Sequence, residues 1–292
     1  MKIVRTVAAL REALAPERYA ARTIGLVPTM GSFHEGHLSL MRQARRDCDV
    51  VVVSLFLNPT QFAPSEDLET YPQDEQRDAR IAEAEGVDLL FAPAVDEVYP
   101  DGFETTVSLG GLTSVLEGEP RGRGPGHFAG VATVVTKLFN MVGPDVAYFG
   151  QKDAQQALVV LKLVRDLDIP VRIQVCPTIR DSDGLALSTR NAYLSSQERE
   201  RALALSKALR AAEAAVDGGE RDGSAVLRAA RVELERAGIE PEYLELRSSS
   251  DLSPVERVNG TTLLAVAARV GRARLIDNVI LGAIQTDRSN ST

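Results

Sequence analysis

The chain has 292 residues, of which 44% are hydrophobic and 25% charged, and it carries a formal net charge of -8 at pH 7. This balance predicts a folded protein with room for two domains, and its acidity disfavours nucleic acid or an anionic membrane surface as a partner. Two cysteines without CxxC spacing, and no apolar run near the roughly 18 residues of a membrane span, lead us to expect a cytoplasmic protein, neither exported nor inserted in a membrane.

The first 178 residues alternate short apolar runs with amphipathic stretches, a pattern typical of a parallel sheet covered by helices. The expected strands are 24–28, 50–56, 87–93, 146–149 and 171–175, and the expected helices are 36–46, 73–85, 130–141 and 154–167. This alternation predicts a doubly wound, Rossmann-like α/β domain, in which ligands bind at the carboxyl ends of the strands.

The pattern changes after residue 178. A polar loop, IRDSDGLALSTRN, precedes a helix expected at 196–216, and a second helix is expected to end near Gly238. The β-branched segments that follow, with a turn at Gly271, indicate a small antiparallel sheet. Residues 179–285 are therefore expected to form a smaller C-terminal α+β domain, and residues 286–292 a disordered tail.

Two of the chain's three histidines, His34 and His37, lie in PTMGSFHEGH (residues 28–37), where the first of these strands ends and a helix begins. The amino end of a helix attracts phosphate, and Gly31 and Gly36 would let a ligand approach the backbone. Three residues apart on one helix face, the imidazoles could stabilise charge on a phosphate or donate a proton to it. The alternatives are two surface histidines or a zinc pair, which would need a third protein ligand.

Two further segments offer cations and hydroxyls. GQKD (residues 150–153) follows a predicted strand, where Lys152 could pair with phosphate oxygens; a plain turn with an Asp cap is the alternative. LSTRN (residues 187–191) could form a mobile flap over a triphosphate, hinged at Gly184, or could be an interdomain linker. The chain contains no GxxxxGK[ST] sequence, which excludes a P-loop.

Uncharged amides occur at two of these strand ends. NPTQF (residues 58–62) follows the second strand, and Gln155 and Gln156 follow the GQKD turn, so their amides could orient a small polar substrate. The third histidine, His127, is expected just before a helix, where a lone histidine is more often structural than catalytic. The residues alone thus indicate adenylyl or nucleotidyl transfer from ATP at the edge of a sheet.

Taken together, the segments PTMGSFHEGHLSL, VVVSLFLNPTQF, YPDG, LEG, GHFAGV, FGQKDAQQ, DGLALSTRNAYL and RLIDN resemble, in order and over about residues 1–284, the pantothenate synthetase (pantoate–β-alanine ligase) family. That family has the HIGH-like and KMSKS-like signatures of the nucleotidylyl transferase superfamily. The resemblance implies an amide-forming ligase of coenzyme A biosynthesis. Pantoate would attack the α-phosphate of ATP to give pantoyl adenylate and pyrophosphate, and β-alanine would then displace AMP to give pantothenate.

The resemblance also implies roles for individual residues. Catalytic roles would fall to His37 as proton donor and to His34, Lys152, Ser188 and Arg190. ATP would contact Met30, Gly31, Ser32, Phe33, His34, Glu35, Gly36, His37, Gly150, Gln151, Lys152, Asp153, Ile179, Leu187, Ser188, Thr189 and Arg190. Pantoate and β-alanine would contact Pro28, Met30, Phe56, Asn58, Gln61, His127, Val134, Val135, Leu138 and Gln156. Mg²⁺ would bridge the β- and γ-phosphates, with Asp78 as a protein contact.

In this scheme residues 1–178 bind ATP and pantoate, residues 179–285 form a lid that carries the KMSKS-like loop, and the protein is a homodimer joined through its N-terminal domain. The sequence departs from the commoner pattern at Thr60, Gln151 and Thr189, where Met, Glu and Ser are usual. A longer stretch before GHF leaves open whether Arg121 or Arg123 takes the place of the family's arginine.

Three alternatives remain at this stage. The first is an adenylyltransferase that retains AMP in its product, of the pantetheine-phosphate or nicotinamide-mononucleotide type. The second is a fragment of a class I aminoacyl-tRNA synthetase, which the net charge disfavours. The third is a nucleotide sensor without catalytic activity.

Overall fold

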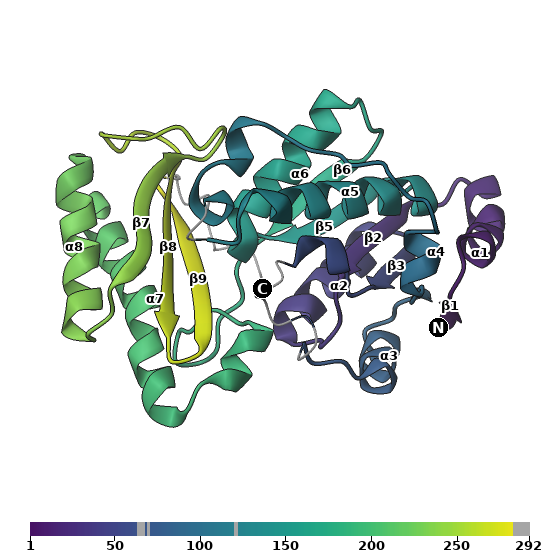
Figure 1. Cartoon of the computed structure of the whole chain (residues 1–292), viewed down its shortest axis with the longest axis horizontal. Coiled ribbons are helices and arrows are strands. Elements are labelled where there is room, and N and C mark those ends of the chain that lie inside the picture. Colours follow the sequence, from purple (N-terminus) through teal and green to yellow (C-terminus); the bar gives the residue numbers. More distant parts are fainter. Residues whose placement is uncertain (63–67, 69–70, 120–121, 283–292) are drawn as a thin grey trace. The chain divides into compact units, whose positions relative to one another are not determined.

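The computed structural model describes residues 1–62, 68, 71–119 and 122–282 (Figure 1). These residues divide into two compact units. The N-terminal unit comprises Met1–Ile179 together with Leu187–Thr189, and the C-terminal unit comprises Arg180–Ala186 and the chain from Arg190 onward. The loop Leu187–Thr189 thus belongs with the N-terminal unit, which a single boundary near residue 178 does not provide for.

The N-terminal unit is built on six parallel strands in the order β1-β4-β3-β2-β5-β6. In that order their bounds are Lys2–Val4, Leu89–Phe91, Val50–Leu55, Ile24–Thr29, Val146–Gly150 and Arg172–Cys176. Its helices are α1 (Val7–Tyr19), α2 (Glu35–Asp47), α3 (Glu75–Ala84), α4 (Val95–Val98), α5 (Pro125–Val142) and α6 (Ala154–Asp166). Short 3₁₀ turns lie at Pro59–Gln61, Gly111–Thr113, Leu116–Gly118 and Gln151–Asp153.

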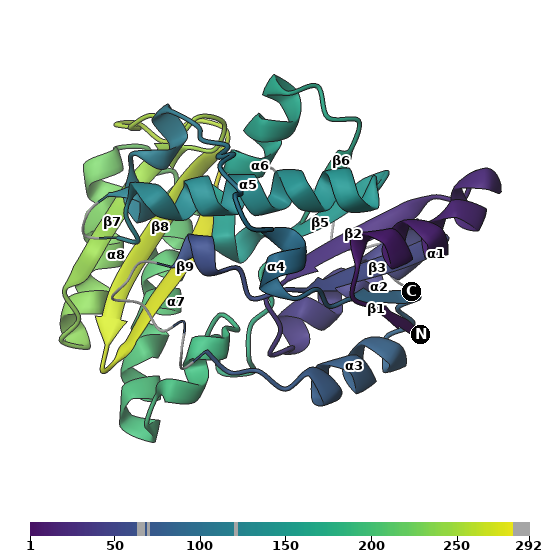
Figure 2. The same cartoon turned by 45° about the vertical axis from the view of Figure 1, so that its right-hand side comes forward.

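Helices cover both faces of this sheet (Figure 2). Along β3, Val50 and Val52 pack into a cluster with side chains of α1, α5 and α6, whereas Val51 and Val53 pack with α2 and α3. Alternate residues of a strand point to opposite faces, so an unbroken valine run is the sequence expected of a strand buried on both sides. The expected doubly wound α/β fold is confirmed.

The C-terminal unit pairs two helices with a small antiparallel sheet. The helices are α7 (Ser196–Asp217) and α8 (Gly223–Arg236), and the strands, in sheet order, are β7 (Pro241–Ser248), β8 (Thr262–Val270) and β9 (Ala273–Leu281). Apolar residues of both helices and all three strands share one buried cluster. This is the smaller α+β unit that the sequence predicts, and its β8–β9 hairpin turns at Gly271, whose φ is +57°.

Two details differ from the expectations. The pattern did not predict β1 and α1, because a three-residue strand and a helix with dispersed charges give a weak periodic signal. Helix α5 begins at Pro125 rather than at residue 130, since proline fits the first turn of a helix, and His127 therefore lies inside the helix. The expected tail, residues 286–292, lies outside the described residues.

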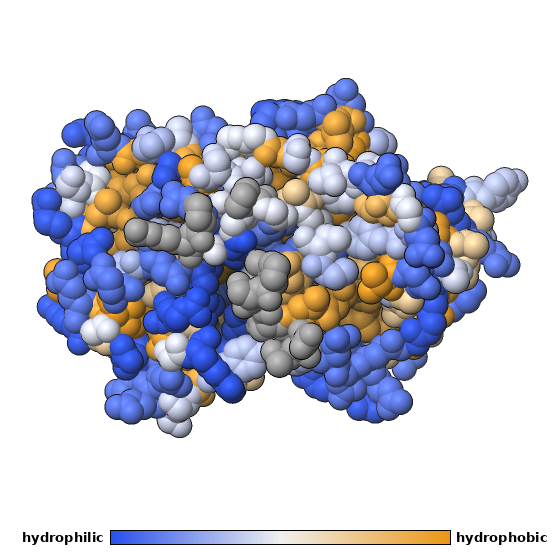
Figure 3. All heavy atoms as spheres, viewed as in Figure 1, coloured by the Kyte–Doolittle hydropathy of each residue, from blue (hydrophilic) through white to orange (hydrophobic). Residues whose placement is uncertain are grey.

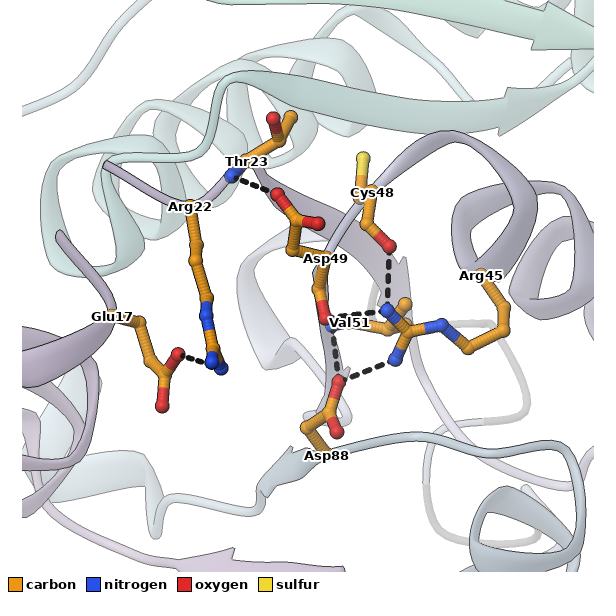
Figure 4. Close-up of polar contacts among 8 residues, drawn as sticks. All are labelled: Glu17, Arg22, Thr23, Arg45, Cys48, Asp49, Val51 and Asp88. Atoms are coloured by element: carbon orange, nitrogen blue, oxygen red, sulfur yellow. Dashed lines mark hydrogen bonds and ion pairs between the residues drawn. The ribbon is translucent and has the colours of Figure 1, made fainter. Parts of the chain in front are cut away.

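The amino-end edge of the parallel sheet is closed by paired polar groups (Figure 4). Arg45 forms an ion pair with Asp88 at 2.7 Å, and Asp88 also accepts the backbone N–H of Val51 at 2.8 Å. Asp49 accepts the backbone N–H of Thr23 at 2.9 Å. Carboxylates thus satisfy backbone donors at the beginning of the two central strands.

Exposed hydrophobic side chains are dispersed over several elements. They come from β1, α1, α4, α8, and α6 with the residue after it. The face drawn in Figure 3 shows hydrophobic and hydrophilic side chains side by side. The large ones are Ile3, Tyr19, Val95, Leu161, Leu167 and Val232. Scattered residues of this kind are normal on a protein surface. Among the described helices, none combines the length and the apolar character that a membrane crossing needs.

Candidate functional site

The predicted site segments follow four neighbouring strands of one parallel sheet. PTMGSFHEGH continues from β2, NPTQF follows β3, GQKD follows β5, and Ile179 follows β6. In the sheet these strands lie in the order β3-β2-β5-β6 (Figure 1). Because all four are parallel, their carboxyl ends share one edge, where open α/β sheets bind their ligands.

The loop after β2 has a strained backbone that a buried carboxylate holds in place. Gly31 has a φ of +92° and Ser32 a φ of +55°, and a Cβ on Gly31 would lie only 2.7 Å from Leu55 Cδ1. The two oxygens of Asp78, on α3, accept the backbone N–H groups of Ser32 at 2.6 Å and Phe33 at 2.9 Å. Asp78 therefore sets the shape of this loop from a distant part of the sequence.

This arrangement does not support Asp78 as the expected metal contact. Its side chain is 1% exposed, and Arg77 approaches it at 3.4 Å in addition to the two amides. Its lone pairs are directed into the protein. Within the described residues, no group of three or more His, Cys, Asp or Glu side chains is placed to hold a metal ion.

The two histidines of this segment cap helix α2. His34 is its N-cap residue, and its Nδ1 accepts the N–H of Gly36 at 3.1 Å, while His37 Nδ1 accepts the N–H of His34 at 3.4 Å. The ring centroids are 4.2 Å apart. An accepting Nδ1 leaves the proton of each neutral ring on Nε2. The rings thus share one helix face, as expected.

Gly36 also makes room for the histidine that caps the helix. A Cβ at this position would lie 2.8 Å from Cε1 of His34, so a bulkier residue would push that ring out of its capping position. Its expected part in letting a ligand approach the backbone stays a prediction.

His37 is electrically neutral in this environment. Burial is the largest cause and the neighbouring His34 the next, and together they lower the pKa of His37 to about 3. Asp153 raises and Lys152 lowers this pKa by smaller amounts, which places the GQKD turn within electrostatic range of His37. With this pKa the ring is neutral at neutral pH and carries an N–H that can donate a hydrogen bond.

The GQKD turn is a short 3₁₀ segment between β5 and α6. Lys152, whose side chain is 20% exposed, lies 3.7 Å from the carboxylate of Asp153. Asp153 occupies the N-cap position of α6, but its side chain makes no capping hydrogen bond. The alternative of a plain Asp-capped turn is therefore not what the chain builds here.

Gln61 connects the segments that follow β2, β3 and the start of α5. Its side-chain amide donates to the sulfur of Met30 at 3.0 Å and accepts from the amide of Asn58 at 3.1 Å. Its backbone oxygen lies 2.8 Å from Nδ1 of His127. The Gln61 side chain is buried, and its hydrogen bonds to Met30 and Asn58 hold it in place.

Asn58 contacts the side chain of Gln61, and His127 contacts its backbone, through hydrogen bonds. Asn58 is 1% exposed, donates to the backbone oxygen of Gly130 at 3.2 Å, and accepts the hydroxyls of Thr60 and Tyr99, each at 2.9 Å. Its polar atoms are thus taken up within the protein. His127 is also buried and directed at the backbone of Gln61. Both residues therefore belong to the same buried hydrogen-bond network as Gln61.

Thr60 and Tyr99 are the residues of this network that the sequence did not single out for a role. Thr60 stands where the family resemblance leads us to expect methionine. Its hydroxyl donates a hydrogen bond to Asn58 that methionine could not make. Arg123 lies 3.4 Å from the other ring nitrogen of His127 and over the ring of Phe62. The competing position, Arg121, lies outside the described residues.

The expected apolar substrate residues come from two elements. Phe56 follows β3, and Val134, Val135 and Leu138 lie on α5; all four are buried in one hydrophobic cluster. Pro28, in β2, is half-buried. Leu138 lies four residues after Val134 and three after Val135, so it neighbours both of them on the surface of α5.

The two glutamines of α6 have different surroundings. Gln155 is buried, and its amide group binds the backbone of Glu117, Leu112 and Val115 at 3.0, 2.7 and 2.8 Å, which is a structural role. Gln156 is only half-buried. Of the two, Gln156 is therefore the better placed to offer its amide to a ligand.

The KMSKS-like segment is split between the two units. Leu187 donates its backbone N–H to Ile179 at 3.0 Å, and its Cβ lies 4.0 Å from the position of a Cβ on Gly36, beside the HxGH turn. Ser188 and Thr189 belong to the same unit, whereas Arg190 belongs to the C-terminal unit.

Gly184, the expected hinge of this segment, lies in a hydrogen-bonded turn. Its φ of +96° suits a glycine, but its N–H donates to Asp181 at 2.8 Å and closes a tight turn. A hinge residue must be able to change its backbone angles, and a hydrogen-bonded turn opposes that change.

Comparisons with known proteins identify the family of the chain. The family model described as pantoate-beta-alanine ligase matches residues 2–280. A pantothenate synthetase from Moorella thermoacetica is 51% identical over 282 residues, covering 96% of this chain and 99% of the relative. One from Thermotoga neapolitana is 50% identical, covering 97% of this chain and 100% of the relative.

Solved structures show the same likeness. The crystal structure of pantothenate synthetase from Thermus thermophilus has a TM-score of 0.90 and 47% identity, covering 96% of this chain and 99% of that one. A pantoate-beta-alanine ligase from Francisella tularensis, complexed with beta-gamma ATP and beta-alanine, has a TM-score of 0.78 and 35% identity, covering 96% and 97%. The chain described here therefore belongs to the pantoate–β-alanine ligase family.

Proposed function

We propose that the chain condenses pantoate with β-alanine at the expense of ATP, releasing pantothenate, AMP and pyrophosphate. Family membership supports this function, as does the ATP-type ligand and β-alanine in the related Francisella tularensis structure. The observation that carries the proposal is the assembly at one sheet edge. Gln61 contacts Met30 there, and the GQKD turn acts electrostatically on His37.

In the first step, the carboxylate of pantoate attacks the α-phosphorus of ATP and pyrophosphate leaves. The nucleophile is already deprotonated at neutral pH and the leaving group is a stable anion, so this step needs no general acid. It needs hydrogen-bond donors for the charge that develops on the phosphate oxygens. Neutral His37, with its Nε2 proton, and His34 beside it supply such donors, while Lys152 attracts the leaving phosphates.

The residues proposed to bind ATP extend over three segments. Met30 to His37 form the turn before α2, Gly150 to Asp153 form the turn before α6, and Ile179 with Leu187 to Arg190 complete the set. The hydrogen bond between Leu187 and Ile179, and the approach of Leu187 to Gly36, support a common site for these segments in the N-terminal unit. Arg190 belongs to the C-terminal unit, and the role of that unit as a lid is carried over from the family resemblance.

Pantoate is proposed to lie between amides and apolar side chains. Gln61 and Gln156 would hold its hydroxyl and carboxylate groups, and Phe56, with Val134, Val135 and Leu138 on α5, would enclose its two methyl groups. The held position of Gln61 supports this role. In the second step the amine of β-alanine attacks the carbonyl carbon of the adenylate near Gln61, loses a proton, and displaces AMP.

Mg²⁺ enters this proposal as a companion of ATP. The described residues provide no cage of carboxylates for it, and Asp78 is used by the loop after β2. Mg²⁺ commonly binds through the phosphates of a nucleotide, and we assign it there, with no step routed through a metal held by the protein. A homodimer through the N-terminal unit rests on the family resemblance, and a cytoplasmic location rests on the two cysteines without CxxC spacing.

Product analysis tests the function. The chain is incubated with ATP, pantoate and β-alanine, and the products are separated by chromatography, with each acid omitted in turn. AMP and pantothenate should form only when both are present. Formation of ADP would exclude an adenylate route, and a stable adenylylated product would indicate the alternative, an adenylyltransferase. Unchanged turnover in His37→Ala would favour a sensor.

A further inference from the structure

A buried carboxylate stands in the apolar sheet of the C-terminal unit. Asp277 lies on β9 opposite Val266 of β8, and its side chain is 3% exposed. Arg180 holds it with two hydrogen bonds, Nη1 to Oδ2 at 2.6 Å and Nη2 to Oδ1 at 2.9 Å. Asp277 also accepts the backbone N–H of Asn278 at 2.8 Å. A buried ion pair often stabilises a protein no more than apolar residues would, but a bidentate pair fixes the orientation of the guanidinium relative to the carboxylate.

Arg180 is the first residue after the chain leaves the N-terminal unit, and it begins a closed turn. Arg180 pairs with Ala186 in a β-bridge, and its guanidinium also reaches the backbone oxygen of Gly184 at 3.3 Å. Leu187, directly after the turn, bonds back to Ile179, directly before it. The KMSKS-like segment therefore follows a turn whose first residue, Arg180, is held by Asp277.

The same hairpin supports the chain beyond that segment. A Cβ on Gly271, at the β8–β9 turn, would collide with the carboxylate of Glu198, so the turn packs directly on the start of α7. Arg272 lies over the ring of Tyr193 at 5.1 Å. Both ends of the segment from Arg180 to Glu198 thus rest on β8–β9.

We propose that Arg180 and Asp277 are a positioning pair for the KMSKS-like segment, and that they act on the step that uses the triphosphate. This inference rests on the proposed function. The pair touches no reacting atom. It holds the turn from which Leu187 to Arg190 extend, and so sets where their hydroxyl and guanidinium groups lie.

The test separates the two half-reactions. Pantoate-dependent exchange of pyrophosphate into ATP reports adenylation, and aminolysis of supplied pantoyl adenylate by β-alanine reports the second step without a triphosphate. Arg180→Lys keeps the charge but not the two-pronged geometry, and Asp277→Asn removes the charge. The matched control is Glu242→Gln, which weakens a 2.6 Å pair with Arg274 across the same sheet.

We expect Arg180→Lys and Asp277→Asn to lower the exchange rate by about ten- to a hundredfold, the scale of a small misplacement of reacting groups. Aminolysis should stay within about twofold of the unmodified protein, and Glu242→Gln should leave both rates unchanged. An exchange rate within about twofold in the folded variants would overturn the proposal, as would equal losses in both half-reactions, which indicate a merely structural role. If Asp277→Asn does not fold, Arg180→Lys decides.

Hydrogen exchange without any ligand separates failure of this inference from failure of the function. The amides of Gly184 and Leu187, which donate within the turn, should exchange faster in Arg180→Lys and at the original rate in Glu242→Gln. Unaltered exchange in Arg180→Lys would overturn the positioning role whether or not the chain is a ligase. An unmodified protein with no pyrophosphate exchange, but with the expected change at the turn, would overturn the proposed function instead.

Discussion

The two edges of the parallel sheet use polar residues in different ways. At the amino edge, full charges meet full charges: Arg45 pairs with Asp88, and carboxylates take the backbone donors of Thr23 and Val51 (Figure 4). At the carboxyl edge, the expected site combines charged residues such as Lys152 with a neutral imidazole, His37, and the amide of Gln61.

The difference reflects what each edge has to do. An edge that only closes the fold can satisfy its donors with carboxylates of the same chain. An edge that binds a triphosphate must in addition present hydrogen-bond donors to the anion. Backbone donors are satisfied at this edge too, because the buried carboxylate of Asp78 holds the loop after β2.

The largest effect is expected from His37→Ala. Removing a donor to the charge that develops on the α-phosphate should lower kcat for AMP formation by about a hundredfold or more. His37→Asn retains an N–H donor and should keep part of the activity. Steady-state kinetics checks both variants, and the thermal unfolding midpoint serves as the folding control. Equal activity of Ala and Asn variants would contradict a donor role.

Lys152→Met should have the next largest effect. Loss of a charge-assisted contact to phosphate costs about 1.5–3 kcal/mol, so kcat/KM for ATP should fall roughly 10- to 100-fold. The control is Lys162→Met, which removes the same charge from an exposed i, i+4 pair with Asp166 on α6. A similar loss in both variants would show that net charge, not position, matters.

Asp78→Ala and Asp88→Ala test the difference between the two edges most directly, because each removes one carboxylate that accepts backbone N–H groups. Asp78→Ala leaves two backbone donors without acceptors and should lower stability by about 1–3 kcal/mol while raising KM for ATP. Asp88, with a side chain 46% exposed, should lose less stability and leave KM unchanged. Denaturant unfolding and ATP kinetics measure the two quantities. A changed KM in Asp88→Ala would remove the distinction.

The smallest effect is a pH dependence of stability. The pKa of His37 is lowered to about 3 in the folded chain, against about 6.5 for an ordinary histidine. Between these values the unfolded chain binds more protons, so the contribution of His37 to stability falls as the pH drops through this window. From about pH 7.5 to about pH 5, the unmodified chain should lose more unfolding free energy than His37→Asn. Equal losses would contradict the lowered pKa.

Local sequence patterns were sufficient to predict the helices and strands that bury one or both faces. The valine run of β3 predicts a strand covered on both sides, and the glycine-marked turn at Gly271 predicts the β8–β9 hairpin. The start of α5 at Pro125 was missed, although proline in a first helical turn is itself a signal. The motifs also place the candidate site residues after particular strands, and parallel strands bring their carboxyl ends to one edge.

The sequence by itself therefore determined the fold class, the sheet edge and the residue types that meet there, since these depend on periodicity and on motif position. Only the tertiary structure decided what individual groups do. Partial burial beside His34 lowers the pKa of His37, and Asp78 binds a loop 45 and 46 residues away in sequence. The tertiary structure also pairs Arg180 with Asp277 across 97 residues. Desolvation and long-range hydrogen bonds depend on which elements pack together, and no local pattern records that.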